Sequence, residues 1–229
     1  MKTVGLLGGM SWQSTSLYYK MINELVRNQL GGLHSAKICM VSVDFHEIEQ
    51  LQFAGEWQKA GELLAEQARK VESGGADFLL LCTNTMHKVA GAIEGAITIP
   101  MLHLADATAS AIKQDGKRKV GLLGTRFTME QEFYKGRLKQ QGLEVIIPDD
   151  RGMQRVHDII FDELCKGVVR NSSRQSYLEI MDSMIKQGAE GIILGCTEIC
   201  MLVNQTHAQV PLFNTTEIHA AEAVKLALT

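Results

Sequence analysis

Short, uninterrupted apolar runs alternate along the chain with segments in which apolar residues recur every three or four positions. The runs VGLLG that begin at Val4 and at Val120 have the length of a strand and end in a turn signal. The residues that follow the first run form a single apolar stripe, which predicts an amphipathic helix: Leu17, Tyr18, Met21, Ile22, Leu25 and Val26. Met129, Phe133 and Leu138 predict a shorter helix after the second run.

The same order of segments occurs twice. GADFLLLCTNT from Gly75 matches GAEGIILGCTE from Gly188, and ITIPML around Pro100 matches AQVPLF around Pro211. Between these segments, SAKICMVSVDF and LEVIIPD read as second strands, and residues 55–73 and 174–187 have helical periodicity. Alternating strands and helices give right-handed βαβ units around parallel sheets that are covered on both faces. We therefore predict an α/β fold of two similar Rossmann-like or flavodoxin-like parallel-sheet lobes, related by internal duplication.

The boundary between the lobes is predicted near residues 104–116, where LADATASAIKQDGKRK leads into the second copy. This gives a first lobe of residues 1–104 and a second lobe of residues 105–214. The helix predicted within residues 215–229 has no counterpart before Val120 except residues 104–114. We expect it to pack back on the first lobe.

Composition narrows the classes of partner. Of 229 residues, 45% are hydrophobic and 21% charged, and the formal charge of −3 shows no basic excess for nucleic acid or an anionic membrane. The apolar run at the start stops at Gly8 and Gly9, too soon for a signal-peptide core, and no stretch reaches membrane-spanning length. We expect a cytoplasmic protein with a small-molecule partner.

The cysteines and glycines suggest neither a metal nor a nucleotide. Five cysteines are scattered without a CxxC or Cys/His ligand spacing, which predicts neither a disulfide framework nor a zinc site. GLLGGM forms neither a GxGxxG fingerprint nor a Walker A loop, so it gives little support for nucleotide binding.

Four loops rich in Gly, Ser and Thr follow predicted strands, at residues 8–15, 83–87, 124–128 and 196–199. In parallel α/β sheets, ligands bind beyond the carboxyl ends of the strands, where helix N-termini favour anions. Each loop taken alone is explained by helix capping. Four loops related by the repeat favour a ligand cleft between the lobes.

Aligning the repeat from Gly75 and Gly188 without gaps places Thr83 opposite Cys196, at equivalent, facing positions. A thiol at a strand end beside a helix N-terminus is expected to have a pKa lowered toward neutrality, so that it exchanges protons near pH 7. The other cysteines are interpreted as small buried hydrophobes. His87 either orients the loop after Thr83 or is only a local hydrogen-bonding group.

The chain resembles the aspartate/glutamate racemase superfamily, in its cofactor-independent aspartate racemase branch, over essentially its whole length. The resemblance is carried by GLLGGMSWQSTSLYY from Gly5, TNTMH from Thr83, GLLGT from Gly121 and GCTEI from Gly195. It implies a homodimer of two-lobed chains with the active site between the lobes, no cofactor, and one cysteine from each lobe exchanging the α-proton of an amino acid. It also implies substrate contacts for these residues: Met10, Ser11, Asn84, Thr85, Thr125, Thr128, Lys166 and Thr197. Lys166 has the alternative of a solvated lysine at a helix C-terminus.

Two positions depart from the family pattern. Thr83 stands where the family has a cysteine, and a hydroxyl is a far weaker acid than a thiol. We therefore expect Cys196 to deprotonate the L-enantiomer readily and Thr83 to support only slow exchange at the D-face. Residues 42–52 lack the arginine that aspartate racemases tend to carry for the second carboxylate, and Gln52 is the nearest substitute.

Three alternatives to aspartate/glutamate racemisation remain at this level. Gln52 brings no charge, which leaves room for a neutral polar amino acid such as homoserine. A single thiol in the second lobe also suits decarboxylation of substituted malonates, although GGMSWQST favours the racemase branch. Two α/β lobes around a cleft also suit a non-catalytic amino-acid sensor.

Overall fold

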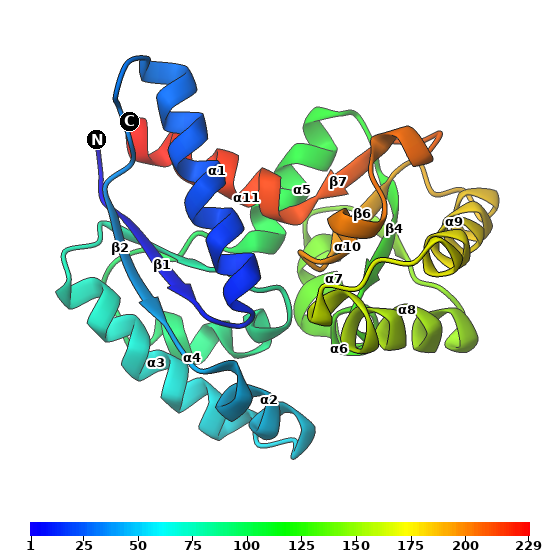
Figure 1. The fold of residues 1–229 in the computed structure, drawn as a ribbon, viewed down its shortest axis with the longest axis horizontal. Coiled ribbons are helices and arrows are strands. Elements are labelled where there is room, and N and C mark those ends of the chain that lie inside the picture. The colour runs from blue at the N-terminus through cyan, green and yellow to red at the C-terminus, as the bar shows by residue number, and fades with distance from the viewer. The chain divides into compact units, whose positions relative to one another are not determined.

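The computed structural model describes residues 1–229 and divides them into two compact units. The first unit consists of Met1–Leu104 together with His219–Thr229, and the second of Ala105–Ile218. Each unit contains one parallel sheet, of three strands in the first and four in the second (Figure 1). The predicted α/β class with two parallel sheets is confirmed.

The first sheet has the order β2-β1-β3, with β1 at Val4–Gly8, β2 at Ile38–Ser42 and β3 at Phe78–Leu81. The helices of this part are α1 (Trp12–Leu30), α2 (Phe45–Phe53), α3 (Trp57–Ser73), the 3-10 helix η1 (Thr85–Val89) and α4 (Ala90–Glu94). The central strand β1 is buried over its whole length because helices cover both of its faces (Figure 1). On one face, Tyr18 and Ile22 of α1 pack with Leu6, and on the other, Leu64 of α3 packs with Leu7.

The second sheet has the order β5-β4-β6-β7, formed by β4 (Lys119–Gly124), β5 (Glu144–Ile146), β6 (Ile192–Gly195) and β7 (Leu212–Asn214). Its helices begin with α5 (Leu104–Gln114), α6 (Arg126–Glu130), α7 (Glu132–Gln140) and α8 (Asp150–Asp162). They continue with η2 (Leu164–Lys166), α9 (Asn171–Lys186), α10 (Ile199–Leu202) and η3 (Gln205–His207). The last helix, α11 (Thr215–Leu228), begins in the second unit and passes into the first unit at His219.

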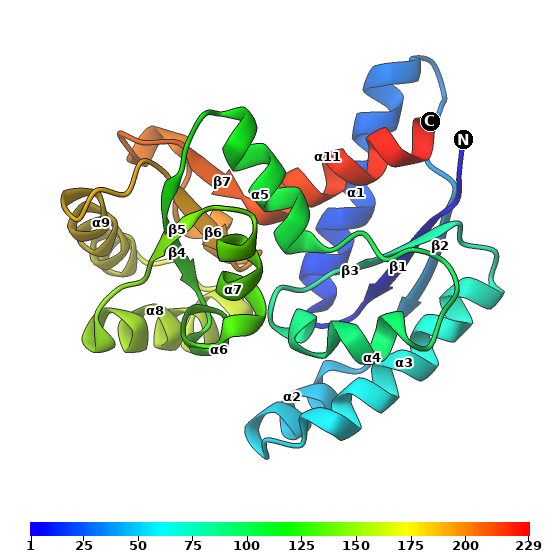
Figure 2. The ribbon, with the colours of Figure 1, turned by 180° about the vertical axis from the view of Figure 1, so that it is seen from behind.

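The two faces of the second sheet have different cover. Helices α8 and α9 pack against Leu123 of β4 and Ile192 of β6. Helices α5 and α7 lie side by side (Figure 2), and the Tyr134 hydroxyl donates to Thr108 Oγ1 at 3.2 Å between them. The C-terminal part of α11 belongs to the first unit, where Ala220 and Val224 pack with the α1 face of the sheet. No helix of the chain is both long enough and apolar enough to span a membrane.

The internal repeat extends to individual hydrogen bonds. The Leu79 N–H donates to the Pro100 carbonyl at 2.9 Å, and its counterpart Ile192 donates to the Pro211 carbonyl at 2.9 Å. In the second unit this contact belongs to a full strand, β7, whereas in the first unit Leu79 and Met101 form only an isolated bridge. The repeat predicted from the sequence therefore has a matching register, with a shortened fourth strand in the first copy.

Gly5 and Gly121 occupy matching places in the two copies, at the point where a helix crosses closest to the first strand of its sheet. A Cβ on Gly5 would lie 2.7 Å from the Phe78 carbonyl oxygen and 2.7 Å from Val71 of α3. A Cβ on Gly121 would lie 2.7 Å from the terminal methyl of Met184 in α9, the counterpart of Val71. The glycine in each VGLLG run thus allows a helix to pack directly on the sheet.

Candidate active site

Thr83 lies just beyond the carboxyl end of β3, and its side chain is largely buried, with 8% of the residue exposed. The backbone around it is held from three directions. The Cys82 N–H donates to the Leu7 carbonyl of β1 at 2.9 Å, and the Ser14 hydroxyl of α1 donates to the Cys82 carbonyl at 3.0 Å. Nδ1 of His87 lies 2.7 Å from the Thr83 carbonyl oxygen. Asn84 and Thr85, which continue the loop, are also buried.

The loop after β1 lies at the same edge of the sheet. Gly9 has φ of 95°, and a Cβ there would lie 2.2 Å from the Val43 carbonyl oxygen, so only glycine fits. Ser11 is the N-cap of α1, where its hydroxyl accepts from the Ser14 N–H at 3.3 Å. The Met10 side chain is part of the apolar core on the α3 face of the sheet. Of these two predicted residues, Ser11 has a polar side chain at the start of α1, whereas the Met10 side chain packs in the core.

Gln52 joins this group from α2. It is 5% exposed, and its Nε2 lies 2.9 Å from Sδ of Met86, which directly follows Thr85. The first unit therefore brings together the predicted residues Gln52, Thr83, Asn84 and Thr85. The segment that contains Gln52 is helical, as residues 45–53, although the sequence pattern did not predict a helix there.

Cys196 follows β6 in the second unit and is partly buried. Its thiol donates to Oε2 of Glu198 at 2.9 Å, and the Thr197 hydroxyl donates to the same oxygen at 2.8 Å. Glu198 was not among the residues predicted from the sequence, although it stands two positions after Cys196 in the GCTEI motif. It is 7% exposed.

Thr125 and Thr128 lie next to the residue that precedes Cys196. Thr125 is the N-cap of α6 and accepts from the Thr128 N–H at 3.3 Å, and the two hydroxyls lie 3.2 Å apart. A Cβ on Gly195 would lie 3.5 Å from Cγ2 of Thr128, so this side chain borders the strand end. Thr125, Thr128, Cys196 and Thr197 thus form the second group of predicted residues.

The Lys166 side chain forms its ion pair with Asp162, outside that group. Lys166 is the last residue of η2, its side chain is 64% exposed, and its Nζ lies 3.6 Å from a carboxylate oxygen of Asp162. This is the arrangement of a solvated lysine with a weak ion pair.

The expected fall in the pKa of Cys196 is wrong. Burial raises the pKa of this thiol well above its ordinary value, and the negative charge of Glu198, the neighbouring Cys165 and the hydrogen bond to Glu198 raise it further. The helix that was expected to stabilise a thiolate is the four-residue α10, which begins at Ile199. The effect of a carboxylate that accepts a hydrogen bond from the thiol exceeds that of so short a helix on the pKa. Cys196 is therefore a thiol in the free protein.

Three buried imidazoles lie in the first unit: His87, for which the sequence left open a role in orienting the loop after Thr83, and His103 and His219, which were assigned no role. Burial lowers the pKa of His219 to about 4 and also lowers the pKa of His87, which the neighbouring His103 and His219 lower further. No group of three or more His, Cys, Asp or Glu side chains is arranged to hold a metal ion.

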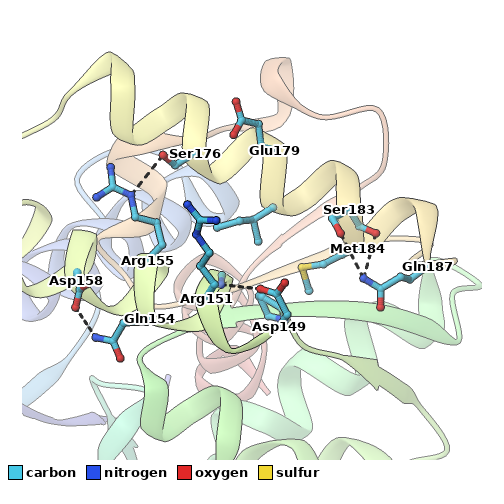
Figure 3. A pocket seen from close by; sticks show the side chains of 13 residues that line it. Asp149, Arg151, Gln154, Arg155, Asp158, Ser176, Glu179, Ser183, Met184 and Gln187 are labelled. Carbon is cyan, nitrogen blue, oxygen red and sulfur yellow. Dashed lines mark hydrogen bonds between the residues drawn. The ribbon is translucent and has the colours of Figure 1, made fainter.

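The second unit also has an open pocket of about 810 Å³ between α8 and α9 (Figure 3). Polar side chains that bond to one another line it: Arg155 Nε donates to Ser176 Oγ at 3.5 Å, and Gln154 Nε2 donates to Asp158 at 2.6 Å. None of the residues predicted for the site lines this pocket.

Comparisons with known proteins identify the family to which the chain belongs. Residues 7–223 match the profile of the Asp/Glu/Hydantoin racemase family. The chain is 26% identical over 230 residues to the broad specificity amino-acid racemase RacX of Bacillus subtilis strain 168, covering 98% of each protein.

Two solved structures extend the similarity over both chains completely. A protein from Yersinia pestis, described as a candidate Asp/Glu racemase, is 56% identical with a TM-score of 0.95, each chain covered to 100%. An aspartate racemase homologue from Pyrococcus horikoshii OT3 is 33% identical with a TM-score of 0.88, again with 100% of each chain covered. The chain therefore belongs to the Asp/Glu/hydantoin racemase family and is an isomerase of the cofactor-independent racemase type.

Proposed function

We propose that this racemase inverts aspartate or glutamate by removing and returning the α-proton, with Cys196 serving the L-enantiomer and Thr83 standing in the place of a second thiol. The observation that carries the proposal is the thiol–carboxylate pair of Cys196 and Glu198 at one strand end, with Thr83 at the equivalent strand end of the other unit.

Cys196 begins the reaction as a thiol and must first lose its proton. Glu198 Oε2, 2.9 Å from Sγ, is placed to accept that proton, and the α-ammonium of a bound amino acid would favour the thiolate through its positive charge. The thiolate then takes the α-proton, which restores the thiol and leaves a carbanion on the substrate. When the thiol proton is replaced by one from solvent before it returns to the same face, the α-proton is exchanged without inversion.

Inversion requires a proton on the opposite face, which the proposal assigns to the Thr83 hydroxyl. Because a hydroxyl is a much weaker acid than a thiol, this step is slow unless water reprotonates the hydroxyl in the same movement. Enantiomers have equal free energies, so kcat/KM must be equal for the two directions of net inversion. The asymmetry is expressed only in exchange with solvent.

The carbanion is stabilised if the substrate carboxylate is held by donors that strengthen as charge develops. Hydroxyl and amide groups that follow four strands of the two units are suited to this: Ser11, Asn84, Thr85, Thr125, Thr128 and Thr197. Most of them are buried beside the first turn of a helix, where anions are favoured. Met10 would contribute through its backbone and packing, and Lys166 would have to leave Asp162 to reach a carboxylate.

The substrate side chain is the less determined part of the proposal. Gln52 offers an uncharged amide, and the relative RacX is a broad specificity racemase, so neutral polar amino acids such as homoserine form a second candidate class. A cytoplasmic homodimer completes the proposal, and its oligomeric state is measured directly by light scattering of the purified protein.

Proton NMR in deuterated buffer tests the reaction, with L- and D-aspartate, L- and D-glutamate and L-homoserine in parallel samples. We expect fast loss of the α-proton signal from one L-substrate, slow net inversion, and little exchange of its D-form. Cys196→Ser should bind the substrate and lose the exchange. Equal exchange of both enantiomers by the wild type would contradict the asymmetric assignment. Release of carbon dioxide from a substituted malonate would identify a decarboxylase. If the wild type binds amino acids but exchanges no α-proton, the protein is a sensor.

A further inference from the structure

The first unit contains a cluster of buried imidazoles that the proposed reaction does not use. His87 and His103 are 2% and 3% exposed and His219 is fully buried. The His87 ring centroid lies 4.5 Å from that of His103 and 6.2 Å from that of His219, each in an edge-to-face arrangement. The cluster comes from three separate segments: η1, the end of the first stretch of the unit, and α11.

The partners of His87 fix where its proton lies. Nδ1 is 2.7 Å from the Thr83 carbonyl oxygen, which only accepts, so Nδ1 carries the hydrogen. Nε2 lies 3.3 Å from the Leu104 backbone nitrogen, whose N–H only donates, so Nε2 has a lone pair. His87 is therefore a neutral bridge with one donor and one acceptor, and both are in use.

The partners of His219 fix the opposite tautomer. Its Nε2 lies 2.8 Å from the Leu102 carbonyl oxygen and must donate, so Nδ1 accepts from the Tyr18 hydroxyl at 2.9 Å. His219 therefore holds the same short segment as His87, but its two ring nitrogens bond to Leu102 and Tyr18 and not to the Thr83 carbonyl. This makes it the natural reference for effects of the cluster as a whole.

The segment that the two imidazoles hold is where the chain leaves the first unit. The chain passes to the second unit between Leu104 and Ala105, and returns between Ile218 and His219. Leu104 is also the first residue of α5, whose N–H has no partner within its own helix. His87 thus connects the carbonyl of Thr83 to the start of the connecting helix.

We propose that His87 is a positioning residue for Thr83, because its imidazole locks the backbone that carries the Thr83 hydroxyl to the first N–H of α5. The inference rests on the proposed function, since it assigns to His87 the alignment of the slow, Thr83-dependent step. The fast step at Cys196 does not depend on this bridge.

Two substitutions separate the two halves of the bridge. The amide nitrogen of asparagine stands where Nδ1 stands in histidine, so His87→Asn retains a donor for Thr83 and loses the acceptor for Leu104. The amide of glutamine reaches the place of Nε2, so His87→Gln retains an acceptor for Leu104 and loses the donor for Thr83. Each variant gives up one hydrogen bond, which makes them a matched pair in stability. Tyr18→Phe serves as a third variant, because it removes the hydroxyl that donates to His219 in the same core and leaves the His87 ring intact.

The measurement is the ratio of net inversion to α-proton exchange for the L-substrate. A misplaced hydroxyl loses alignment with the reacting carbon, so we expect His87→Gln to lower the ratio at least about tenfold. His87→Asn and Tyr18→Phe should leave the ratio within about twofold of the wild type, even where they lower the melting temperature. The nitrogen NMR shifts of the wild-type His87 ring should report a hydrogen on Nδ1 and a lone pair on Nε2.

Three results would overturn the inference. One is an equal loss of inversion and exchange in all variants in proportion to their melting temperatures, which marks a purely structural role. The second is a lower ratio of net inversion to exchange in His87→Asn than in His87→Gln. The third is a hydrogen on Nε2 of His87 in the NMR spectrum of the wild type, a result that does not depend on whether the variants fold. Failure of the proposed function looks different, because the wild type itself then exchanges no α-proton.

Discussion

At the scale of single residues, the chemistry of Cys196 is decided by its neighbours rather than by its place at a strand end. Burial and the carboxylate of Glu198 both raise the pKa of the thiol. The same carboxylate that disfavours a thiolate in the free enzyme is the nearest acceptor for the proton that must leave. Glu198 therefore has two opposed effects, on the acidity of the thiol and on the route of its proton.

Glu198→Gln should separate these two effects. Removing the negative charge lowers the pKa of the Cys196 thiol, by about 1 unit or more for a charge in direct contact. Exchange of the α-proton should nevertheless slow, because the proton acceptor is lost. The pH dependence of iodoacetamide alkylation at Cys196, followed by peptide mass spectrometry, measures the pKa. A midpoint that stays the same or moves to higher pH contradicts this account.

The weak acidity of Thr83 gives a second prediction at the same scale. Thr83→Cys should raise net inversion and exchange of the D-substrate, because a thiol then stands at both strand ends. Thr83→Val, which has the same shape without the hydroxyl, should abolish inversion and leave L-exchange. Chiral chromatography and NMR measure the two rates. If Thr83→Val inverts as fast as the wild type, the D-face proton comes from elsewhere.

At the scale of helices and strands, the internal repeat allows a substitution in one copy to be compared with the matching substitution in the other. Gly5→Ala forces a Cβ against the Phe78 carbonyl, which is backbone and cannot move without disturbing β3. Gly121→Ala meets the ends of the Ile192 and Met184 side chains instead, and these can rotate away. We expect about 2–3 kcal/mol of destabilisation for Gly5→Ala and about 1 kcal/mol or less for Gly121→Ala. Thermal unfolding checks the order, and equal losses would contradict it.

The buried histidines predict a loss of stability in acid. The folded-state pKa of His219, about 4, lies below the ordinary value of 6.5, so the unfolded chain binds the proton more readily. This contribution is complete above pH about 6.5 and is lost as the pH falls toward 4, up to about 3 kcal/mol for this one group.

A double variant tests the contribution of His219 to acid sensitivity without leaving a buried hydrogen-bonding group unpaired. Tyr18→Phe with His219→Gln removes the titrating ring and its hydroxyl partner, while the glutamine amide can still donate to the Leu102 carbonyl. The slope of unfolding free energy against pH between 6.5 and 4 should fall by about one proton. An unchanged slope would contradict the assignment to His219 and leave the acid sensitivity to His87, whose ring lies beside it.

The elements that could be predicted from sequence are those with a strong period or a repeat. VGLLG and its second copy gave β1 and β4, and the apolar stripe gave α1. Helix α8 was not predicted, although Met153, Val156, Ile159 and Ile160 recur at helical spacing and Asp149 caps its start. Helix α2 was not predicted either, and the helix expected over Met129–Leu138 is divided at Gln131 into α6 and α7. In the site, the alignment found the equivalence of Thr83 and Cys196. The alignment does not predict the length of α10 or the burial of the Cys196 thiol, and these two features decide the pKa of the thiol.

At the scale of the whole molecule, the first unit is discontinuous in sequence. Residues 219–229 contribute Ala220, Ala223, Val224 and Ala227 to the core that covers Leu6 and Tyr18, and the Lys2 N–H donates to the Ala227 carbonyl at 2.8 Å. A truncation after Ile218 should therefore expose β1–β3 to amide hydrogen exchange and leave β4–β7 protected. A truncation after Ala227 retains these contacts and serves as the control. Protection of β1 in the shorter chain would contradict the packing role of α11.

This discontinuity also constrains the order of events during synthesis on the ribosome. Residues 105–218 form the second unit without a break and can close their sheet as soon as they emerge. The first unit has all three of its strands much earlier, but the helix that covers one face of them is translated only after residue 218. The half of the enzyme that is made first is therefore completed last, and until then the apolar face around Tyr18 and Ile22 needs protection from aggregation.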